Sequence, residues 1–338
     1  MASSIEVFVR TILLILLAAF LSLTACAPPP RPPEPTDIVW PMPPEPPRIR
    51  YVQSIYAEDD IGRVYSFKEK LFGKDYVDTL ERPYGVFVRN NKIFVTDIVM
   101  KNVLIFDLTT KRLSFAGGEG AIQMPSAAIS DVAGNIYVAD AGSSKIAVYD
   151  AQGVYKTAFP LQDSKPVALV INDALGRIYV IDRSMHRVIV LALDGRQLFE
   201  FGAKGDQNGL FNIPLSIALD RKGNVYVLDN GNFRVQIFDA DGKFISKFGE
   251  VGDGPGFFAN PKGIAVDSEG HIYITDAAFS NFQIFNQEGK LLMYVGSLGN
   301  ARGQMHLPGG ITVDENDRIY VSDQLNKRIE VFQYLKAQ

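Results

Sequence analysis

The stretch Val225–Asp229 reads VYVLD, and five close copies of it occur elsewhere in the chain. The copies end at Asp97, Asp140, Asp182, Asp276 and Asp323, so that successive copies are 42 to 47 residues apart. β-Branched and aromatic residues of this kind favour strands. A strand motif that recurs at such a period indicates a repeat architecture.

Three further apolar runs accompany each copy. A proline and an apolar run lie upstream, as in Pro214–Leu219, a third run lies downstream, and a fourth follows in most units. Asp-x-x-Gly or Asn-x-x-Gly sequences suit the turns between these runs, because Gly adopts positive φ and Asp or Asn caps the turn. Each unit is therefore predicted to be a four-stranded antiparallel meander. One such sheet cannot bury both of its faces, so six are predicted to stack around an axis.

The two ends of the chain are predicted to meet. The last unit ends soon after its third strand, whereas the segment Ile49–Ile55 before the first unit has the alternation of a strand. This segment also aligns with the fourth strand of the preceding unit, which starts at Leu291. We predict that it adds the missing outer strand to the last sheet, because this closes the ring and removes an open edge. A short helix is predicted around residues 66–71.

The repeat resembles the NHL repeat, a family of six-bladed β-propellers, over about residues 48–338. The most complete units read FG-x2-G-x3-G-x-F-x2-P-x2-I-A-x-D-x2-G, at residues 201–223 and 248–270. The last unit has Met305 where these two have Phe211 and Phe258, and the first three units lack the full motif. The resemblance implies an all-β fold of six four-stranded blades.

Some enzymes similar to this family bind zinc. Peptide-amidating lyases bind zinc through histidines near the start of the innermost strands. Here the residues directly after the repeat prolines are Tyr84, Ser126, Val167, Leu215, Lys262 and Gly309. None is a histidine, and the three histidines of the chain, His186, His271 and His306, stand at three different repeat positions. No metal, cofactor or catalytic residue is therefore predicted.

The six repeat aspartates, which end the second strands, are expected to be structural. They lie one strand spacing away from the innermost strand, so they do not converge on the axis as metal ligands would. The residue five positions later is basic in four of the six units, as in Arg234. Each Asp is expected to brace the loop at the start of the third strand.

The N-terminus is predicted to direct export. Residues 11–25 form an uncharged apolar run that is too short to span a bilayer comfortably but suits a signal peptide. The run ends in Leu23-Thr24-Ala25-Cys26, which resembles the lipobox of bacterial lipoproteins, with Cys26 lipidated as the new first residue. An ordinary secretory signal followed by a chance Cys is the alternative. Residues 1–25 are thus predicted to be a signal peptide. The resemblance to Gram-negative lipoproteins implies that Ala27, after the Cys, favours sorting to the outer membrane.

A proline-rich segment follows the single cysteine. Eleven of the twenty residues from Pro28 to Pro47 are proline, which excludes a helix and favours extended polyproline II. Residues 26–47 are predicted to be a tether for a propeller that spans residues 48–338, and a proline-rich ligand for another domain is the alternative. Trp40, the only tryptophan, lies in this segment and could dock on some other surface.

One face of the propeller is the predicted interaction surface. It carries the loops after the repeat aspartates and the loops before the prolines, where apolar residues such as Val99 and Leu325 occur. The candidate partner-binding residues are Tyr84, Met100, Met185, Phe233, Lys262, Phe279 and His306. Exposed apolar side chains mark partner sites. The alternative is that several of them fold back and cap the ends of the blades.

The chain as a whole is expected to be a monomeric, lipid-anchored binding or scaffold protein of the bacterial cell envelope that engages a protein or peptide partner. Its 338 residues are 47% hydrophobic and 21% charged, with a formal net charge of −4. This balance, together with export, argues against nucleic-acid binding, although animal NHL proteins bind nucleic acid. The alternative function is a metal-dependent hydrolase or lyase with its site at the central channel.

Overall fold

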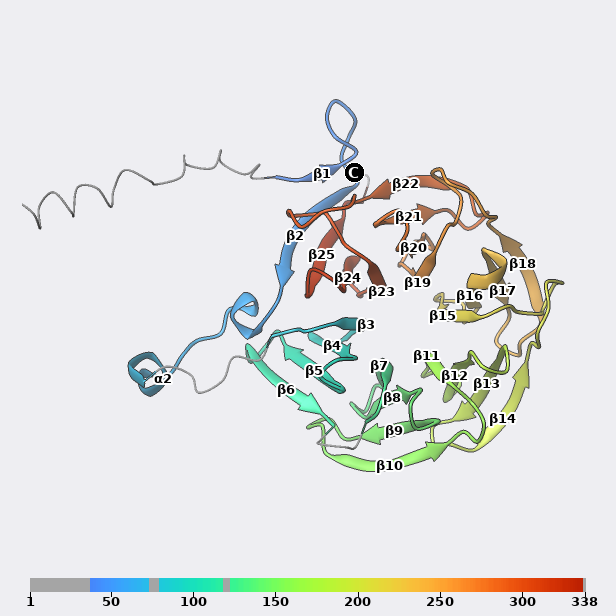
Figure 1. Ribbon diagram of the computed structural model, residues 1–338, viewed down its shortest axis with the longest axis horizontal. Helices are drawn as coiled ribbons and strands as arrows, with labels where there is room; N and C mark the ends of the chain where they lie inside the picture. The colour runs from blue at the N-terminus through green and yellow to red at the C-terminus, as the bar shows by residue number, and fades with distance from the viewer. Residues whose placement is uncertain (1–36, 73–78, 118–121, 337–338) are drawn as a thin grey trace, which may run out of the picture. The chain divides into compact units, whose positions relative to one another are not determined.

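Six antiparallel sheets surround a central axis in the computed structural model, which describes residues 37–72, 79–117 and 122–336 (Figure 1). The predicted six-bladed propeller is therefore confirmed. The first three blades consist, from the axis outwards, of β3 (Pro83–Arg89), β4 (Lys92–Asp97), β5 (Asn102–Asp107) and β6 (Arg112–Ala116); β7 (Pro125–Ser130), β8 (Ile136–Asp140), β9 (Lys145–Tyr149) and β10 (Tyr155–Pro160); and β11 (Pro166–Asn172), β12 (Arg177–Asp182), β13 (Arg187–Ala192) and β14 (Gln197–Phe201).

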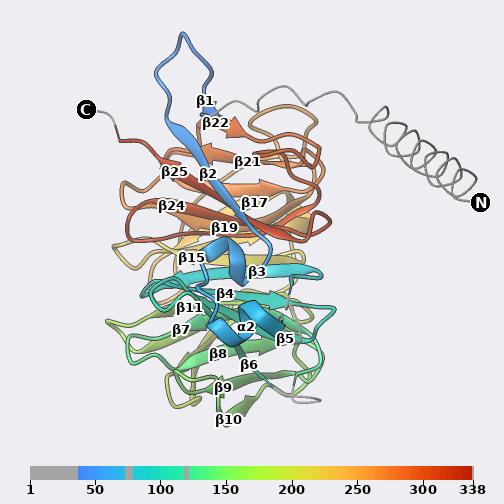
Figure 2. The same ribbon diagram turned by 90° about the vertical axis from the view of Figure 1, so that its left-hand side faces the viewer.

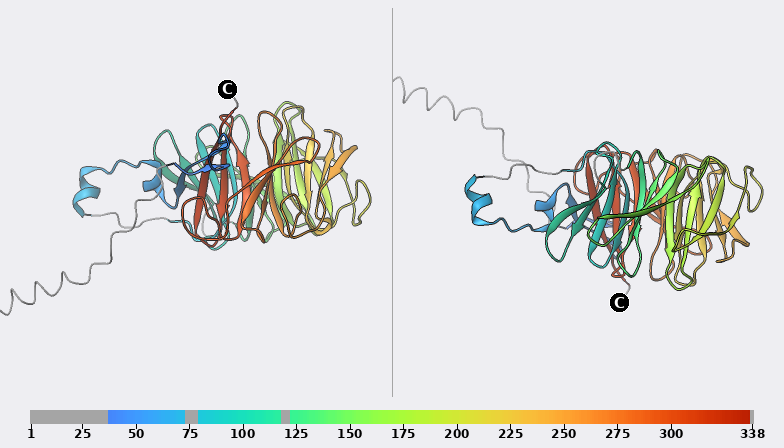
Figure 3. Two further views of the ribbon diagram at one scale, coloured as in Figure 1. Left: turned by 90° about the horizontal axis from the view of Figure 1, so that it is seen from above. Right: turned by 90° about the horizontal axis from the view of Figure 1, so that it is seen from below.

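The next two blades repeat the same order. They consist of β15 (Pro214–Leu219), β16 (Val225–Asp229), β17 (Arg234–Phe238) and β18 (Phe244–Phe248), and of β19 (Pro261–Val266), β20 (Ile272–Asp276), β21 (Asn281–Phe285) and β22 (Leu291–Val295). Each innermost strand starts at a repeat proline, and each second strand ends at a repeat aspartate. The strands run between the two faces of the ring, so the loops lie on these faces (Figure 3).

The last blade joins the two ends of the domain, as predicted. It contains β23 (Pro308–Val313), β24 (Arg318–Asp323), β25 (Arg328–Tyr334), β2 (Ile49–Ile55) and β1 (Val39–Trp40), in that order. β2 runs antiparallel to β25 from Ile49, opposite Tyr334, to Ile55, opposite Ile329 (Figure 2). The ring is closed because every innermost strand contacts the innermost strands of both neighbouring blades.

Residues within the segment predicted as a tether take part in this blade. β1 pairs with β2, and the ring of Trp40 lies edge-on to the ring of Phe332, with 5.7 Å between the ring centroids. The structure thus includes Val39 and Trp40 in the edge of the last sheet. Cys26 and the predicted signal peptide lie outside the described residues.

Three short helices accompany the strands in the part of the chain that the structure describes. They are η1 (Glu58–Ile61), α2 (Phe67–Phe72), which matches the helix predicted around residues 66–71, and η2 (Asn230–Asn232). Within residues 37–72, 79–117 and 122–336, no helix has the length and apolar character needed to cross a membrane.

The core fills the space between adjacent blades. Phe211, Phe258 and Met305 are fully buried, and each forms an isolated parallel bridge with the segment that follows the fourth strand of the preceding blade. A glycine precedes each bridge, as Gly249 does for Phe258, because a Cβ at Gly249 would lie 2.3 Å from the phenyl ring. Met305 in the last unit therefore occupies the same place as the two phenylalanines, as the repeat alignment predicts.

Candidate functional site

The described domain has a central channel. It encloses about 430 Å³ and is lined by the innermost strands of all six blades. The residues directly after the six repeat prolines all belong to this lining: Tyr84, Ser126, Val167, Leu215, Lys262 and Gly309. These positions form the end of the channel that we call the mouth, and the surrounding loop surface is the mouth face.

The repeat aspartates hold the mouth in place. All six carboxylates are fully buried, and each accepts at least one hydrogen bond from a backbone N–H group of the loop that leads into an innermost strand. Asp97, for example, accepts from Arg82 at 2.7 Å, and Asp323 accepts from His306 at 2.7 Å. A carboxylate that accepts several N–H bonds is stabilised without another charge. Each Asp thereby fixes the residues that follow the proline.

Three of the six aspartates also pair with the arginine five residues later. The distances from Nε to the carboxylate are 3.2 Å for Arg187, 2.8 Å for Arg234 and 3.0 Å for Arg328. Arg234 and Arg328 are buried, and their guanidinium groups also donate to backbone carbonyls of the loop before the proline. In these two blades the arginine therefore ties the repeat aspartate to the loop before the proline, since the same side chain contacts both.

The mouth has a cationic character. Lys262 and Arg82 line the channel, and Arg183 lies close enough to both Tyr84 and Lys262 to affect their ionisation. Burial and the nearby Arg183 lower the pKa of Lys262, against the opposing influence of Asp276. Burial raises the pKa of Tyr84, which keeps its hydroxyl protonated as a donor.

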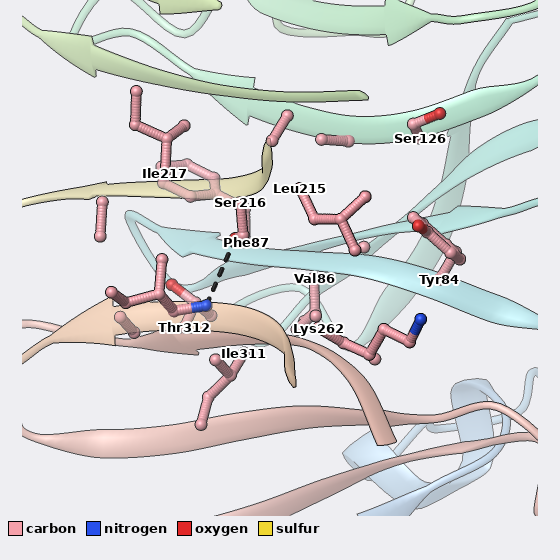
Figure 4. A pocket seen from close by; sticks show the side chains of 18 of the residues that line it. Tyr84, Val86, Phe87, Ser126, Leu215, Ser216, Ile217, Lys262, Ile311 and Thr312 are labelled. Atoms are coloured by element: carbon pink, nitrogen blue, oxygen red, sulfur yellow. Dashed lines mark hydrogen bonds between the residues drawn. The ribbon is translucent and has the colours of Figure 1, made fainter. Parts of the chain in front are cut away.

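The channel wall beyond the mouth is largely apolar. Leu215 and Val86 lie next to the Lys262 and Tyr84 end in Figure 4, and Ile217 lies further along the channel. Ser216 is among the few polar side chains there, and its hydroxyl accepts a 3.3 Å hydrogen bond from the Ile264 N–H. The lining contains no Asp, Glu, His or Cys, so its two charged side chains are both cations.

The other predicted partner residues lie in different settings. Met185 is 50% exposed and His306 is exposed, whereas Phe279 is half-buried. Met100 and Phe233 are partly buried and pack against hydrophobic clusters of their blades.

Other apolar residues of the mouth face are exposed as well. The side chains of Val99 and Leu325, in the loops that follow repeat aspartates, are 59% and 47% exposed. Val99 precedes Met100, one of the predicted partner-binding residues, and Leu325 follows Gln324, which lines the channel.

Arg82 and Gln324 line the channel, and Arg183 lies near Tyr84 and Lys262, but none of the three was among the predicted site residues. Each stands directly beside a repeat landmark: Arg82 precedes Pro83, Arg183 follows Asp182, and Gln324 follows Asp323. The signal was therefore available, because residues that flank the repeat proline and aspartate share one face. In residues 37–72, 79–117 and 122–336 no group of three or more His, Cys, Asp or Glu side chains could hold a metal.

Comparison with known proteins supports the fold. Residues 213–278 match a family described as "6-bladed beta-propeller", and no curated protein matches the chain. A streptogramin B lyase structure is similar with a TM-score of 0.58 and 17% identity, covering 76% of this chain and 94% of that one. A structure of virginiamycin B lyase from Staphylococcus aureus is similar with a TM-score of 0.56 and 15% identity, covering 84% of this chain and 89% of that one.

A binding protein is equally similar. An auxiliary nutrient binding protein from Bacteroides thetaiotaomicron has a TM-score of 0.59 and 11% identity, covering 76% of this chain and 70% of that one. At such identities the likeness establishes the architecture and not the activity. The chain is therefore a six-bladed β-propeller of the kind that both lyases and binding proteins share.

Proposed function

We propose that this chain is an NHL-type lipoprotein of the bacterial cell envelope that binds a protein or peptide partner through its mouth face. The observation that carries the proposal is the combination of exposed Val99, Met185 and Leu325 with a cationic channel mouth on the same face. Covering exposed apolar side chains with a partner lowers the free energy of the complex, and charged groups beside them select that partner.

The anchoring part of the proposal rests on the sequence. Lipidation of Cys26 after removal of residues 1–25 would hold the domain to the membrane, with the proline-rich segment as a spacer. The protein would act as a monomer at the outer membrane, without nucleic acid or a cofactor. Replacing Cys26 with Ser would abolish labelling by radioactive palmitate and release the protein from the membrane fraction; labelling that persists in this variant would refute the anchor.

The mouth face is tested by a triple substitution of Val99, Met185 and Leu325 to Ser. Capture of a partner from an envelope extract should fall strongly, while the melting temperature changes little because about half of each of the three residues is exposed. Met100 and Phe233 are unsuitable for this test, since they pack against the core and their loss would weaken folding.

A matched control comes from the opposite face. Val132, Val154 and Leu175 are 74%, 61% and 50% exposed and lie in the turns at the other end of the blades. Their triple replacement by Ser should leave capture of the same partner unchanged. Equal capture by both triple variants and the wild type would refute the mouth face as the binding surface.

The alternative of a metal-dependent hydrolase or lyase at the channel is not proposed. The channel lining offers amide, hydroxyl, ammonium and guanidinium groups but no carboxylate, imidazole or thiolate. A catalytic zinc site needs several such ligands directed at one point.

A further inference from the structure

The end of the channel at the mouth contains an ammonium group without a partner among the described residues. Lys262 forms no ion pair or hydrogen bond there, although its side chain is half-buried. In Figure 4 the Lys262 amine and the Tyr84 side chain lie at the same end of the cavity, near Ser126. Arg82 also belongs to the lining. Donors and positive charge are therefore concentrated at one end.

Keeping this ammonium charged has an energetic cost. Burial disfavours the charged form, and repulsion from Arg183 adds to this. The carboxylate that opposes these effects, Asp276, already accepts hydrogen bonds from the backbone N–H groups of Ala259 and Asn260 at 2.9 and 3.0 Å. An anion placed at the mouth would relieve both effects, because it offsets the repulsion and supplies an acceptor for the ammonium group.

The rest of the cavity selects for an apolar group. Beyond the mouth the wall is formed mainly by aliphatic side chains, which include Val86, Leu169, Ile217 and Ile264. The volume of about 430 Å³ lies within the range of small-ligand pockets. A ligand that fills this channel would therefore have a charged end at the mouth and an apolar body along the wall.

We propose that the channel binds a carboxylate carried on a short apolar chain, with the carboxylate at Lys262 and Tyr84 and the chain against the aliphatic wall. The ammonium and the phenol hydroxyl supply two donors, which suits the two oxygens of a carboxylate. Two sources share this chemistry: the C-terminal carboxylate of a peptide with apolar last residues, or a free monocarboxylic acid. The proposal goes beyond partner binding on the mouth face, because it assigns a ligand to the channel itself.

Titration calorimetry on the full chain tests the chemistry with two pairs of probes. One pair is octanoate and octanamide; the other is a hexapeptide ending in three leucines, with a free or an amidated C-terminus. In at least one pair the acid should bind at least about tenfold more tightly than the amide, and the pair that does so identifies the source. Equal binding of acid and amide in both pairs, or no binding of any probe, would overturn the proposal, as would inorganic phosphate competing as well as octanoate.

Substitutions test the residues. Lys262→Met should weaken binding of the acid about tenfold to a hundredfold, because a charge-assisted hydrogen bond is lost, and Tyr84→Phe should weaken it several-fold. Lys243→Met, in an exposed turn between β17 and β18, removes the same charge away from the channel and should leave affinity unchanged. Unchanged affinity in a folded Lys262→Met variant would refute the assignment. Partner capture by the mouth face is measured separately, so it survives if only the carboxylate probes fail.

Discussion

Glu330 is predicted to make the closed ring less stable as the pH rises. Its carboxyl is fully buried in β25, where it accepts a 2.8 Å hydrogen bond from the Ser54 hydroxyl of β2 and lies 2.7 Å from Arg328. Burial outweighs the attraction of Arg328 and raises the pKa of Glu330 from 4.5 to about 7. The folded state therefore holds this proton more tightly than the unfolded state, and stability falls as the pH rises from about 4.5 to about 7.

Glu330→Gln is the appropriate perturbation because the fold already contains it. Gln236 and Gln283 occupy the equivalent position in the two preceding blades, are fully buried, and accept backbone N–H bonds from Gly209 and Gly256. In the first of these blades the glutamine also follows an arginine by two residues, as Glu330 does. The amide should therefore fit without rearrangement.

The size of the effect follows from the pKa. A tenfold change in an ionisation constant is worth about 1.4 kcal/mol, so the rise from 4.5 to about 7 corresponds to at most about 3 kcal/mol of unfolding free energy above pH 7. A neutral amide avoids this cost. We expect Glu330→Gln to be nearly neutral at pH 5 and to stabilise the protein by about 1–3 kcal/mol at pH 8.

Urea unfolding at several pH values measures the difference directly. Glu250→Gln is the control, because it removes an exposed carboxylate of equal charge and should shift stability little at either pH. The reasoning fails if the advantage of Glu330→Gln is the same at pH 5 and pH 8, or if this variant is the less stable one at pH 8.

Three further substitutions probe the repeat and the edge of the last blade. Gly249→Ala should lower the free energy of unfolding by about 2 kcal/mol or more, because the φ of Gly249 is +96° and the new Cβ would lie 2.3 Å from Phe258. Gly254→Ala is the control: no atom lies nearer than 4.0 Å to the Cβ it would add, so it should have little effect in the same urea titration. Asp229→Ala should cost about 3–5 kcal/mol, since it leaves a buried guanidinium without its carboxylate; a loss below 1 kcal/mol would contradict this. The fluorescence of Trp40 should shift to the red on unfolding, because its ring packs against Phe332 in the native protein. Trp40→Ala should lower the free energy of unfolding by about 1 kcal/mol. Native emission at the wavelength of a solvent-exposed tryptophan would show that β1 is not docked on β2.

The strands and the closure of the ring were predictable because they depend on local patterns. The repeated VYVLD-type phrase, the prolines and the Gly turns each specify a strand or turn within a few residues, and the structure places the innermost strands at those prolines. The pairing of Ile49–Ile55 with β25 followed from counting, since the last unit lacked one strand and an open edge is unfavourable.

The site was predictable only in part. Tyr84 and Lys262 were identified because the position after the proline faces the axis in every blade. The partial burial of Met100 and Phe233 depends on side chains from elsewhere in the fold, and loop sequence alone leaves both outcomes open. The contribution of Arg183 could not be read from its own blade, because the charge it affects, Lys262, belongs to another.

The sequence by itself determined the number of blades, their strand order and the residues that ring the axis, because these follow from short-range periodicity repeated six times. Only the tertiary structure decided which of those residues carry an unneutralised charge, which loop side chains remain exposed, and that Val39 and Trp40 complete the edge of the last blade. The physical reason is that burial and electrostatics depend on distances between blades. Such distances are set by the packing of the whole ring and are encoded in no single repeat.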